Sequence, residues 1–330
     1  MKSRKYSPVF VIGCHRSGTA LLYDTLLSAG GFAIYHASFP VYSTLLPISG
    51  DLSVARNRER LMEVWLRSMQ FRRSGLPGEF RSKIQDECRN GGDFLRIVLG
   101  EVARRENAGR WAVYDPDNIL HIPTVKREVP EALFVHIVRD GRDAALSLRK
   151  VGAIRPLWWD RQRWLLAAGL NWQWTVRKGR QYAQMFPSDY IEVHYEDLVT
   201  QPEKALSTLA EFLDHDLDYS RIQNSAVGRV NSPNTSWKEE AQLGSFSPIN
   251  RWRTKLSQPE IAALELLIGD CLEQFGYSLA TKDRRSHADP RLSLMRVLYP
   301  RYFDAKLSLK SNTFLGRFAS TNPLQLTQAL

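Results

Sequence analysis

A strand, a tight glycine loop and a helix follow one another within residues 9–25, and this unit limits the fold more than any other stretch of the chain. The apolar run Val9–Ile12 predicts a buried strand, and Ala20–Ala29 predicts the helix after the loop. Further apolar runs of strand length recur at Trp111–Tyr114, Leu133–Val138 and Tyr190–Val193. Strands alternating with helical patterns predict an α/β fold with three layers, α/β/α, around a central, mainly parallel sheet.

The other helices are expected where apolar residues recur at helical spacing. They are Arg56–Gln70, Phe94–Arg105, Asp143–Lys150, Trp164–Tyr182, Glu203–Leu213 and, as the last helix, Glu260–Phe275. Residues 228–259 are rich in Ser, Asn, Pro and Gly, which predicts a long ordered loop. We expect one domain over residues 1–280, compact to about Tyr277, and a basic C-terminal extension over residues 281–330.

The net charge of +10 favours an anionic partner such as a nucleotide, a sulfated or phosphorylated substrate, a nucleic acid or a lipid surface. No aromatic and basic nucleic-acid module is visible, so nucleic acid is not expected. From Thr281 onward, nine Lys/Arg stand against three Asp/Glu. The piece LSLMRVLYPRYFDAKLSLK in this region predicts a surface arm, a peripheral membrane contact or one more packed helix. We expect a packed or loosely ordered extension.

The cysteines and the lengths of the apolar stretches indicate the cellular compartment in which the protein is expected. The three cysteines are far apart and odd in number, which argues against disulfides and predicts a reducing, cytoplasmic setting. The chain has no C-x-x-C or H-x-x-x-H pair, so we expect no metal site. No apolar stretch approaches twenty residues, which predicts a soluble protein or one peripheral to a membrane. Nothing in the composition constrains the oligomeric state.

The first loop carries the spacing of a phosphate-binding loop. Gly13 and Gly18 match the first part of G-x-x-x-x-G-K-[ST], so the expected fold is like that of P-loop NTPases. Thr19 and Ala20, however, occupy the positions of the lysine and the hydroxyl residue. Backbone N–H groups at the helix start, with Arg16 as the permanent cation, predict an anion site without that lysine. Its expected residues are Cys14, His15, Arg16, Ser17, Gly18, Thr19 and Ala20.

A second strand, a charged turn and a helix occupy residues 132–148. Arg139 emerges at the carboxyl end of the strand, where open α/β sheets bind ligands, and Ser147 lies in the second turn of the following helix. An Arg and a Ser together suit a phosphate monoester. Taken alone, the segment fits a surface cluster of ion pairs better than a phosphate site. That cluster would join Arg139, Asp140, Arg142 and Asp143.

Together, the two segments resemble those of sulfotransferases that use 3′-phosphoadenosine 5′-phosphosulfate (PAPS). His15–Ala20 resembles the family loop P-[KR]-S-G-T-T, which holds the 5′-phosphosulfate. Val138–Ser147 resembles the segment V-R-D-x-R-D-x-x-x-S, which binds the 3′-phosphate. The resemblance spans roughly residues 8–277. It is closest to the branch with Arg in the loop, which includes bacterial and tyrosylprotein sulfotransferases. It implies metal-free, in-line transfer of a sulfuryl group from PAPS to an acceptor hydroxyl.

Weaker matches extend the resemblance. They are Trp111–Pro116 with Val125–Pro130, the Y-E-D-L at Tyr195–Leu198, the closing G-x-W-[KR]-x-x-L element at Gly244–Leu256, and Phe275–Tyr277. The resemblance implies that Arg251 and Trp252 contact the adenosine or its phosphates. Relatives often carry a lysine near the sulfuryl group where this chain has Tyr114, and a second Thr where it has Ala20. Arg16 must then supply more of the charge.

The sequence offers several candidates for the general base, the residue that takes the proton from the acceptor hydroxyl. His36 stands where the tyrosylprotein branch places its catalytic Glu, and histidine titrates near neutral pH. Asp115 follows a strand on the same side of the sheet as the loop, and His121 is a third candidate. With Arg16, His36 and Asp115 are therefore the expected catalytic residues.

The acceptor is expected to be a carbohydrate or another small or lipid-linked alcohol, and the basic charge favours an anionic one. Five tryptophans either line an acceptor cleft or pack in the core, and helical spacing favours the core for Trp164 and Trp172. A P-loop kinase or another NTP-dependent enzyme is an alternative, but it needs a lysine after Gly18 and a carboxylate for magnesium. A catalytically inactive sulfotransferase-like binding protein is a second alternative.

Overall fold

A computed structural model describes residues 4–160, 163–225, 227, 230, 244, 247–281 and 290–326. Five parallel strands form a central sheet in the order β2-β3-β1-β4-β5. The strands are β1 (Val9–Gly13), β2 (Phe32–Ala33), β3 (Arg110–Tyr114), β4 (Leu133–Val138) and β5 (Tyr190–His194). The parallel α/β sheet predicted from the sequence is therefore confirmed.

β1 lies in the middle of the sheet and is buried on both faces. Val11 pairs with Tyr114 of β3 on one side and with Val135 of β4 on the other. Phe10 and Ile12 pack into the core on one face, whereas Val9 and Val11 pack into the core on the opposite face. A strand covered on both faces reads as a continuous apolar run, which is why the sequence identified it.

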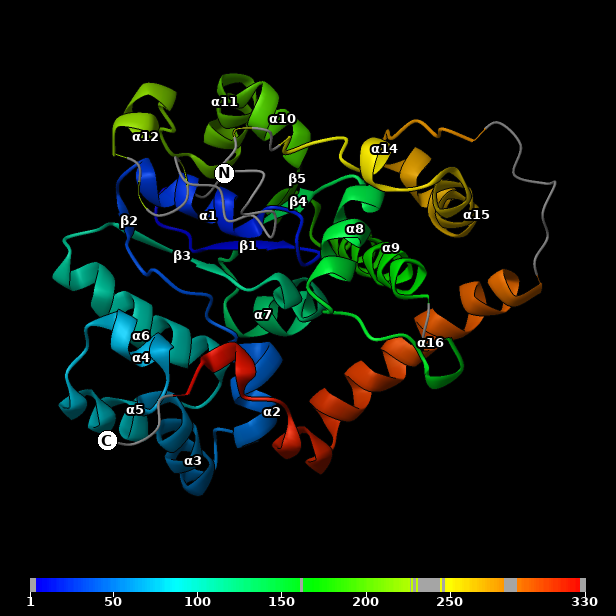
Figure 1. The fold of residues 1–330 in the computed structure, drawn as a ribbon. Coiled ribbons are helices and arrows are strands. Elements are labelled where there is room, and N and C mark those ends of the chain that lie inside the picture. Colours follow the sequence, from blue (N-terminus) through cyan, green and yellow to red (C-terminus); the bar gives the residue numbers. More distant parts are fainter. Residues whose placement is uncertain are drawn as a thin grey trace.

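Helices cover both faces of the sheet, as the ribbon shows (Figure 1). One layer holds α1 (Thr19–Ser28), α10 (Tyr195–Thr200), α11 (Pro202–Leu213) and α12 (Tyr219–Ser225). The other holds α2 (Leu46–Ser49), α3 (Ala55–Leu66), α4 (Met69–Ser74), α5 (Arg81–Glu87), α6 (Gly91–Arg105) and α7 (Ile122–Glu128). A third core joins α8 (Gly141–Lys150), α9 (Trp164–Ala183), α14 (Trp252–Lys255), α15 (Gln258–Gln274) and α16 (Pro290–Asn312).

Three expected elements differ from the structure. The single helix expected over Arg56–Gln70 is two helices, α3 and α4, because the hydroxyl of Ser68 caps a new helix by accepting from the backbone N–H of Phe71. Glu260–Phe275 is not the last helix, since α16 follows it. Most of the loop expected over residues 228–259 lies outside the described residues, and its described end contains α14 and the start of α15.

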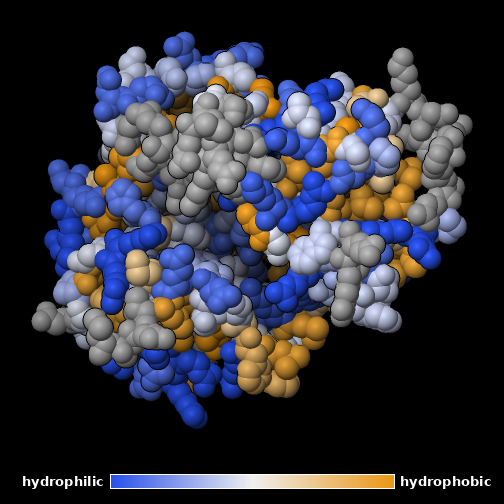
Figure 2. Space-filling model, viewed as in Figure 1, coloured by the Kyte–Doolittle hydropathy of each residue, from blue (hydrophilic) through white to orange (hydrophobic). Residues whose placement is uncertain are grey.

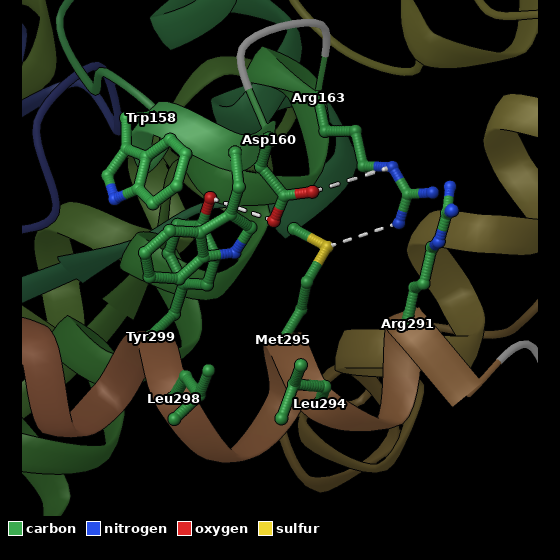
Figure 3. Close-up of a pocket in the computed structure, with 9 residues that line it drawn as sticks. Trp158, Asp160, Arg163, Arg291, Leu294, Met295, Leu298 and Tyr299 are labelled. Atoms are coloured by element: carbon green, nitrogen blue, oxygen red, sulfur yellow. Dashed lines mark hydrogen bonds and ion pairs between the residues drawn. The ribbon is translucent and has the colours of Figure 1, made fainter.

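α16 packs against the domain rather than standing apart from it. Tyr299 and Phe303 are buried in the same core as α9 and α15. The Tyr299 hydroxyl accepts from the backbone N–H of Leu157 at 3.1 Å, and Trp174 Nε1 donates to Asp304 at 3.1 Å. Figure 3 shows Tyr299 and Met295 pointing from α16 towards the segment that carries Trp158. The boundary predicted near residue 280 stays a prediction, because residues 282–289 lie outside the described parts.

Among the described helices, none is both long and apolar enough to cross a bilayer.

Candidate active site

The candidate site lies at the carboxyl ends of β1, β3 and β4, which are neighbours in the sheet. The loop between β1 and α1 turns sharply there: Arg16 has φ 71° and Gly18 has φ 99°. A Cβ atom on Gly18 would lie 2.5 Å from the ring of Tyr195, and one on Gly13 would lie 2.5 Å from the carbonyl oxygen of Ile137. Only glycine satisfies both the backbone angle and the space at these two positions.

The loop places hydrogen-bond donors at the start of α1. The backbone N–H of Ser17 donates to the Cys14 carbonyl at 3.1 Å, which closes the turn before α1. The Ser17 hydroxyl is fully buried and has no hydrogen-bond partner among the described residues. α1 then begins at Thr19, and its first N–H groups and its dipole favour negative charge at this end. Donors of this kind at a helix N-terminus are the groups that bind phosphate or sulfate in proteins.

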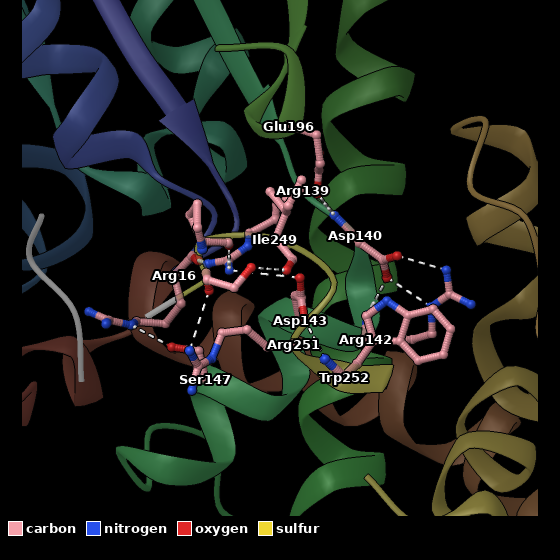
Figure 4. A network of polar contacts seen from close by, with 12 residues as sticks. Arg16, Arg139, Asp140, Arg142, Asp143, Ser147, Glu196, Ile249, Arg251 and Trp252 are labelled. Carbon is pink, nitrogen blue, oxygen red and sulfur yellow. Dashed lines mark hydrogen bonds and ion pairs between the residues drawn. The ribbon is translucent and has the colours of Figure 1, made fainter. Parts of the chain in front are cut away.

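The two predicted segments meet at Arg16 (Figure 4). Arg16 Nε donates to the Ser147 hydroxyl at 3.1 Å, and Arg139 Nη1 donates to the Arg16 carbonyl at 3.1 Å. Arg139 Nη2 also donates to the Pro248 carbonyl at 2.6 Å, and its guanidinium lies 4.5 Å from the centre of the Tyr195 ring. Arg139 Nε is buried and has no hydrogen-bond partner in the part of the chain that the structure describes. The structure thus brings Arg16, Arg139 and Ser147 together.

The charged turn is buried, so it is not a surface cluster of ion pairs. Arg142 donates to both oxygens of Asp140 and, through Nη1, to Glu265 of α15 at 2.6 Å. Its side chain is 2% exposed. Asp143 accepts from the Trp252 backbone N–H at 2.8 Å, and burial raises the pKa of Asp143 to about 6. These bonds fix the turn that positions Arg139.

The Y-E-D-L element supports the same turn. Glu196 accepts from the Asp140 backbone N–H at 3.0 Å and from the Tyr277 hydroxyl at 2.9 Å. Tyr195 lies beneath Gly18 and beside Arg139. Two segments that resemble family motifs, Tyr195–Leu198 and Phe275–Tyr277, therefore hold the Arg139 turn and pack against the loop.

The closing element packs beside this turn. Arg251 is buried, and its Nη1 donates to the Ser247 carbonyl at 3.3 Å. The Trp252 ring is 1% exposed and lies 3.7 Å from the guanidinium of Arg142 and 4.3 Å from that of Arg253. In this arrangement the ring contacts protein groups, and the expected contacts of Arg251 and Trp252 with a nucleotide stay predictions.

An ion pair that the sequence did not predict lies beside the loop. His15 Nε2 is 3.0 Å from Asp117 Oδ1, and the two side chains are 48% and 38% exposed. Partial burial alone would lower the pKa of His15, but the charge and hydrogen bond of Asp117 and the charge of Asp115 raise it to about 9. Burial alone would raise the pKa of Asp117, but His15 and Lys310 lower it well below its usual range. The raised pKa favours a protonated His15 ring beside Arg16 at neutral pH.

The candidate bases occupy different surroundings. Asp115 is buried at the end of β3, where the Ser43 hydroxyl donates to it at 2.5 Å, and burial together with the charge of Asp117 raises its pKa to about 6. His36 is exposed, and among the described residues only its backbone carbonyl is hydrogen-bonded, to Arg73. Burial lowers the pKa of His121 to about 4.

One face of the molecule is hollowed near its centre (Figure 2). Among the described residues, no cluster of three or more His, Cys, Asp or Glu side chains could hold a metal ion.

Comparison with known proteins gives the family. The model of the sulfotransferase family matches residues 8–219, well over half of the chain. The chain belongs to the sulfotransferase family. It is 31% identical over 133 residues to a Caenorhabditis briggsae protein and 30% identical over 126 residues to one from Caenorhabditis elegans, each described as "Putative protein-tyrosine sulfotransferase". These matches cover 39% and 37% of this chain, and the chain spans less than half the length of either relative, 45% and 47%.

A solved structure agrees with the fold of this sulfotransferase-family chain. The sulfotransferase domain of the Synechococcus PCC 7002 olefin synthase aligns with a TM-score of 0.54 and 18% identity. The alignment covers 84% of this chain and 98% of that domain. It supports the α/β architecture described above.

The loop and the Arg139–Ser147 segment of this family member could be predicted from the sequence. Three further residues, which contact the site residues or act on their charges, were not predicted. Asp117 follows the candidate base Asp115 by two residues, so the run Tyr-Asp-Pro-Asp could have suggested a second carboxylate near the site. Lys310 lies in the segment expected to be an extension, yet its charge lowers the pKa of both Asp117 and His121. The role of Ser43, which holds Asp115, had no signal in the sequence because the contact depends on tertiary packing.

Proposed function

We propose that this protein is a sulfotransferase that moves a sulfuryl group from PAPS to an acceptor hydroxyl. The observation that carries the proposal is the joining of two distant segments at Arg16, through Ser147 and Arg139. One segment resembles the family's phosphosulfate loop and the other its 3′-phosphate segment. The Ser17 hydroxyl and Arg139 Nε support the same assignment, because both are buried beside the loop and lack a hydrogen-bond partner among the described residues.

The donor, when bound, supplies the sulfuryl group and leaves as a nucleotide phosphate. Arg16 and the N–H groups at the start of α1 would bind that phosphate and offset the negative charge that grows on it. Arg139 and Ser147 would orient the 3′-phosphate, and Arg139 also fixes the backbone of Arg16. Since these charges come from side chains and backbone dipoles, the proposed transfer uses no metal ion.

His15 is proposed as the second cation of the site. The ion pair with Asp117 keeps its ring protonated, and His15 directly precedes Arg16 in the loop. It would supply the charge that relatives place on a lysine at the position of Tyr114. Its role is electrostatic, so activity should fall when the ring loses its proton.

Asp115 is proposed as the group that accepts the proton from the acceptor hydroxyl. Its raised pKa, about 6, lies closer to the working pH than that of an ordinary carboxylate, and it follows the strand beside β1. His36 stays the alternative that the sequence suggested. Its side chain makes no hydrogen bond to another described residue, so nothing in that part of the fold orients it.

The acceptor is proposed to carry a hydroxyl group, and a tyrosyl peptide is the first class to test because the nematode relatives are named for protein tyrosine. Carbohydrates and lipid-linked alcohols, which the sequence suggested, form the comparison set. An anionic acceptor suits the positive charge of the chain.

The proposal is tested by transfer of labelled sulfate from PAPS to tyrosyl peptides, glycans and lipid-linked alcohols. Arg16→Ala should lower the rate by at least about a hundredfold, because it removes a charge at the developing phosphate. Arg104→Ala is the matched control, since this arginine is exposed and pairs with Glu101 on the surface of α6. Equal rates in the two variants, or no transfer by the unmodified chain to any acceptor class, would refute the proposal.

A further inference from the structure

α16 has an apolar side that does not pack against the domain. Leu292, Tyr299 and Phe303 face the core, whereas Leu294 and Val297 are exposed by 53% and 49%. In Figure 3, Met295 and Tyr299 point from the helix towards Trp158 and Asp160, and Leu294 and Leu298 lie at the front of the helix, where they line the same pocket. A helix with apolar residues on both sides buries only one of them in this fold.

Exposed aromatic side chains flank this apolar side. Trp158 is 75% exposed, and Trp159 beside it is half-exposed. Both line a pocket of about 590 Å³ together with Leu294, Leu298 and Arg291 of α16.

At the other end of the helix, Phe314 and Phe318 are exposed by 70% and 80%. Figure 2 shows apolar residues gathered at the lower edge of the molecule, where Figure 1 places the C-terminal segment. We call these exposed aromatic side chains, with the apolar side of α16, the α16 surface.

The charge of the α16 surface is positive. Arg301, Lys306 and Arg317 are exposed and form no ion pair with another described residue. The acidic residue of α16, Asp304, is turned towards α9, where it pairs with Lys178 at 3.1 Å and accepts from Trp174. The exposed part of α16 and the segment after it therefore combine large apolar groups with uncompensated cations.

We propose that the α16 surface docks the protein on an anionic lipid surface. Tryptophan and phenylalanine enter the interface between headgroups and acyl chains, and Lys/Arg beside them bind anionic headgroups. A helix lying in the interface needs this combination of exposed apolar groups and flanking cations. A second copy of the chain would bury the apolar groups but would bring two positively charged surfaces together. Charge therefore favours the lipid surface over self-association.

Docking has a consequence for the proposed active site, and this part rests on the proposed function. Lys310 lies on the last turns of the same helix, and its charge acts on Asp117 and His121. A protein held at the membrane in this way would meet acceptors that reside there more readily than acceptors in solution.

Co-sedimentation of the full chain with vesicles tests the docking. Vesicles of phosphatidylglycerol and phosphatidylcholine should bind the protein, pure phosphatidylcholine should bind it at least tenfold more weakly, and added salt should release it. Replacing Arg301, Lys306 and Arg317 by Gln should weaken binding by about fivefold for each charge. The double variant Phe318→Ser with Trp158→Ser should weaken it at least tenfold. Met185→Ser is the control, because Met185 is 57% exposed in the turn after α9.

Three results would overturn the proposal. The first is equal binding to anionic and neutral vesicles, and the second is binding that none of the variants changes. The third is a concentration-dependent dimer, detected by sedimentation equilibrium, that the Phe318 and Trp158 variant disrupts while vesicle binding is absent. Nucleotide binding measured on the same variants separates this test from the proposed function, because docking can fail while the donor site stays intact.

Discussion

Gly18 shows how strongly one residue determines the loop. Its φ of 99° disfavours any side chain, and a Cβ atom at this position would lie 2.5 Å from the ring of Tyr195. We expect Gly18→Ala to lower the free energy of unfolding by about 1–3 kcal/mol and to weaken nucleotide binding, because the loop must move. Gly30→Ala is the control: its φ is 81°, but no atom lies within 4 Å of the new Cβ.

Chemical denaturation and nucleotide titration of both variants separate the two effects. Gly30→Ala should show only the smaller loss from backbone strain and unchanged nucleotide affinity. If the two variants were equally stable and bound nucleotide equally well, the close packing of the loop on Tyr195 would be wrong.

At the same scale, His15 predicts the pH dependence of transfer. Activity should rise as Asp115 loses its proton near pH 6 and should fall as His15 loses its proton near pH 9. Asp117→Asn removes the larger of the two charges that raise the pKa of His15, together with its hydrogen bond, so the falling limb should move to lower pH. A rate that instead rises through pH 9 would identify His15 as a base and contradict its role as a cation.

At the scale of elements, a buried ion pair connects α8 to α15. Arg142 and Glu265 lie 2.6 Å apart, with side chains 2% and 0% exposed. Glu265→Gln should lower the free energy of unfolding by about 3 kcal/mol, because it leaves the buried guanidinium of Arg142 incompletely compensated. The same change should weaken donor binding, since the turn that holds Arg139 depends on Arg142.

Glu260→Gln is the matched control on the same helix. Glu260 pairs with Arg149 of α8 at 2.6 Å, but both side chains are about a third exposed. Its loss should change the free energy of unfolding by less than about 1 kcal/mol. Thermal or chemical unfolding of the two variants compares them directly, and equal losses would contradict the importance of burial at Arg142.

Elements close to the sheet could be predicted from the sequence because their signals are local. The runs at Val9–Ile12 and Leu133–Val138 are buried on both faces, so burial and apolarity coincide. The division between α3 and α4 was missed because apolar residues keep helical spacing across Ser68, and only its capping bond reveals the break. The burial of the turn at Arg139–Asp143 was also missed, since a charged segment is buried only when distant partners such as Glu265 compensate it.

At the scale of the whole molecule, the site combines segments that are far apart in the chain. Loop residues Arg16 and His15 meet Asp117 after β3 and Ser147 on α8, and Lys310 on α16 acts on Asp117. The family resemblance could indicate the loop and the Arg139–Ser147 segment because each carries a motif. It could not indicate that the charge of Lys310 acts on Asp117, since that effect depends on the packing of α16 against the domain.

The central claim is that the joined loop and Arg139 segment form the binding site of a nucleotide with a 3′-phosphate. Calorimetric titration of the full chain with 3′-phosphoadenosine 5′-phosphate, in the presence of a chelator, tests it most directly. We predict binding without metal, at least tenfold weaker binding to Arg139→Gln than to Arg104→Gln, and no binding of Mg·ATP. Tight binding of Mg·ATP with no binding of 3′-phosphoadenosine 5′-phosphate would contradict the claim.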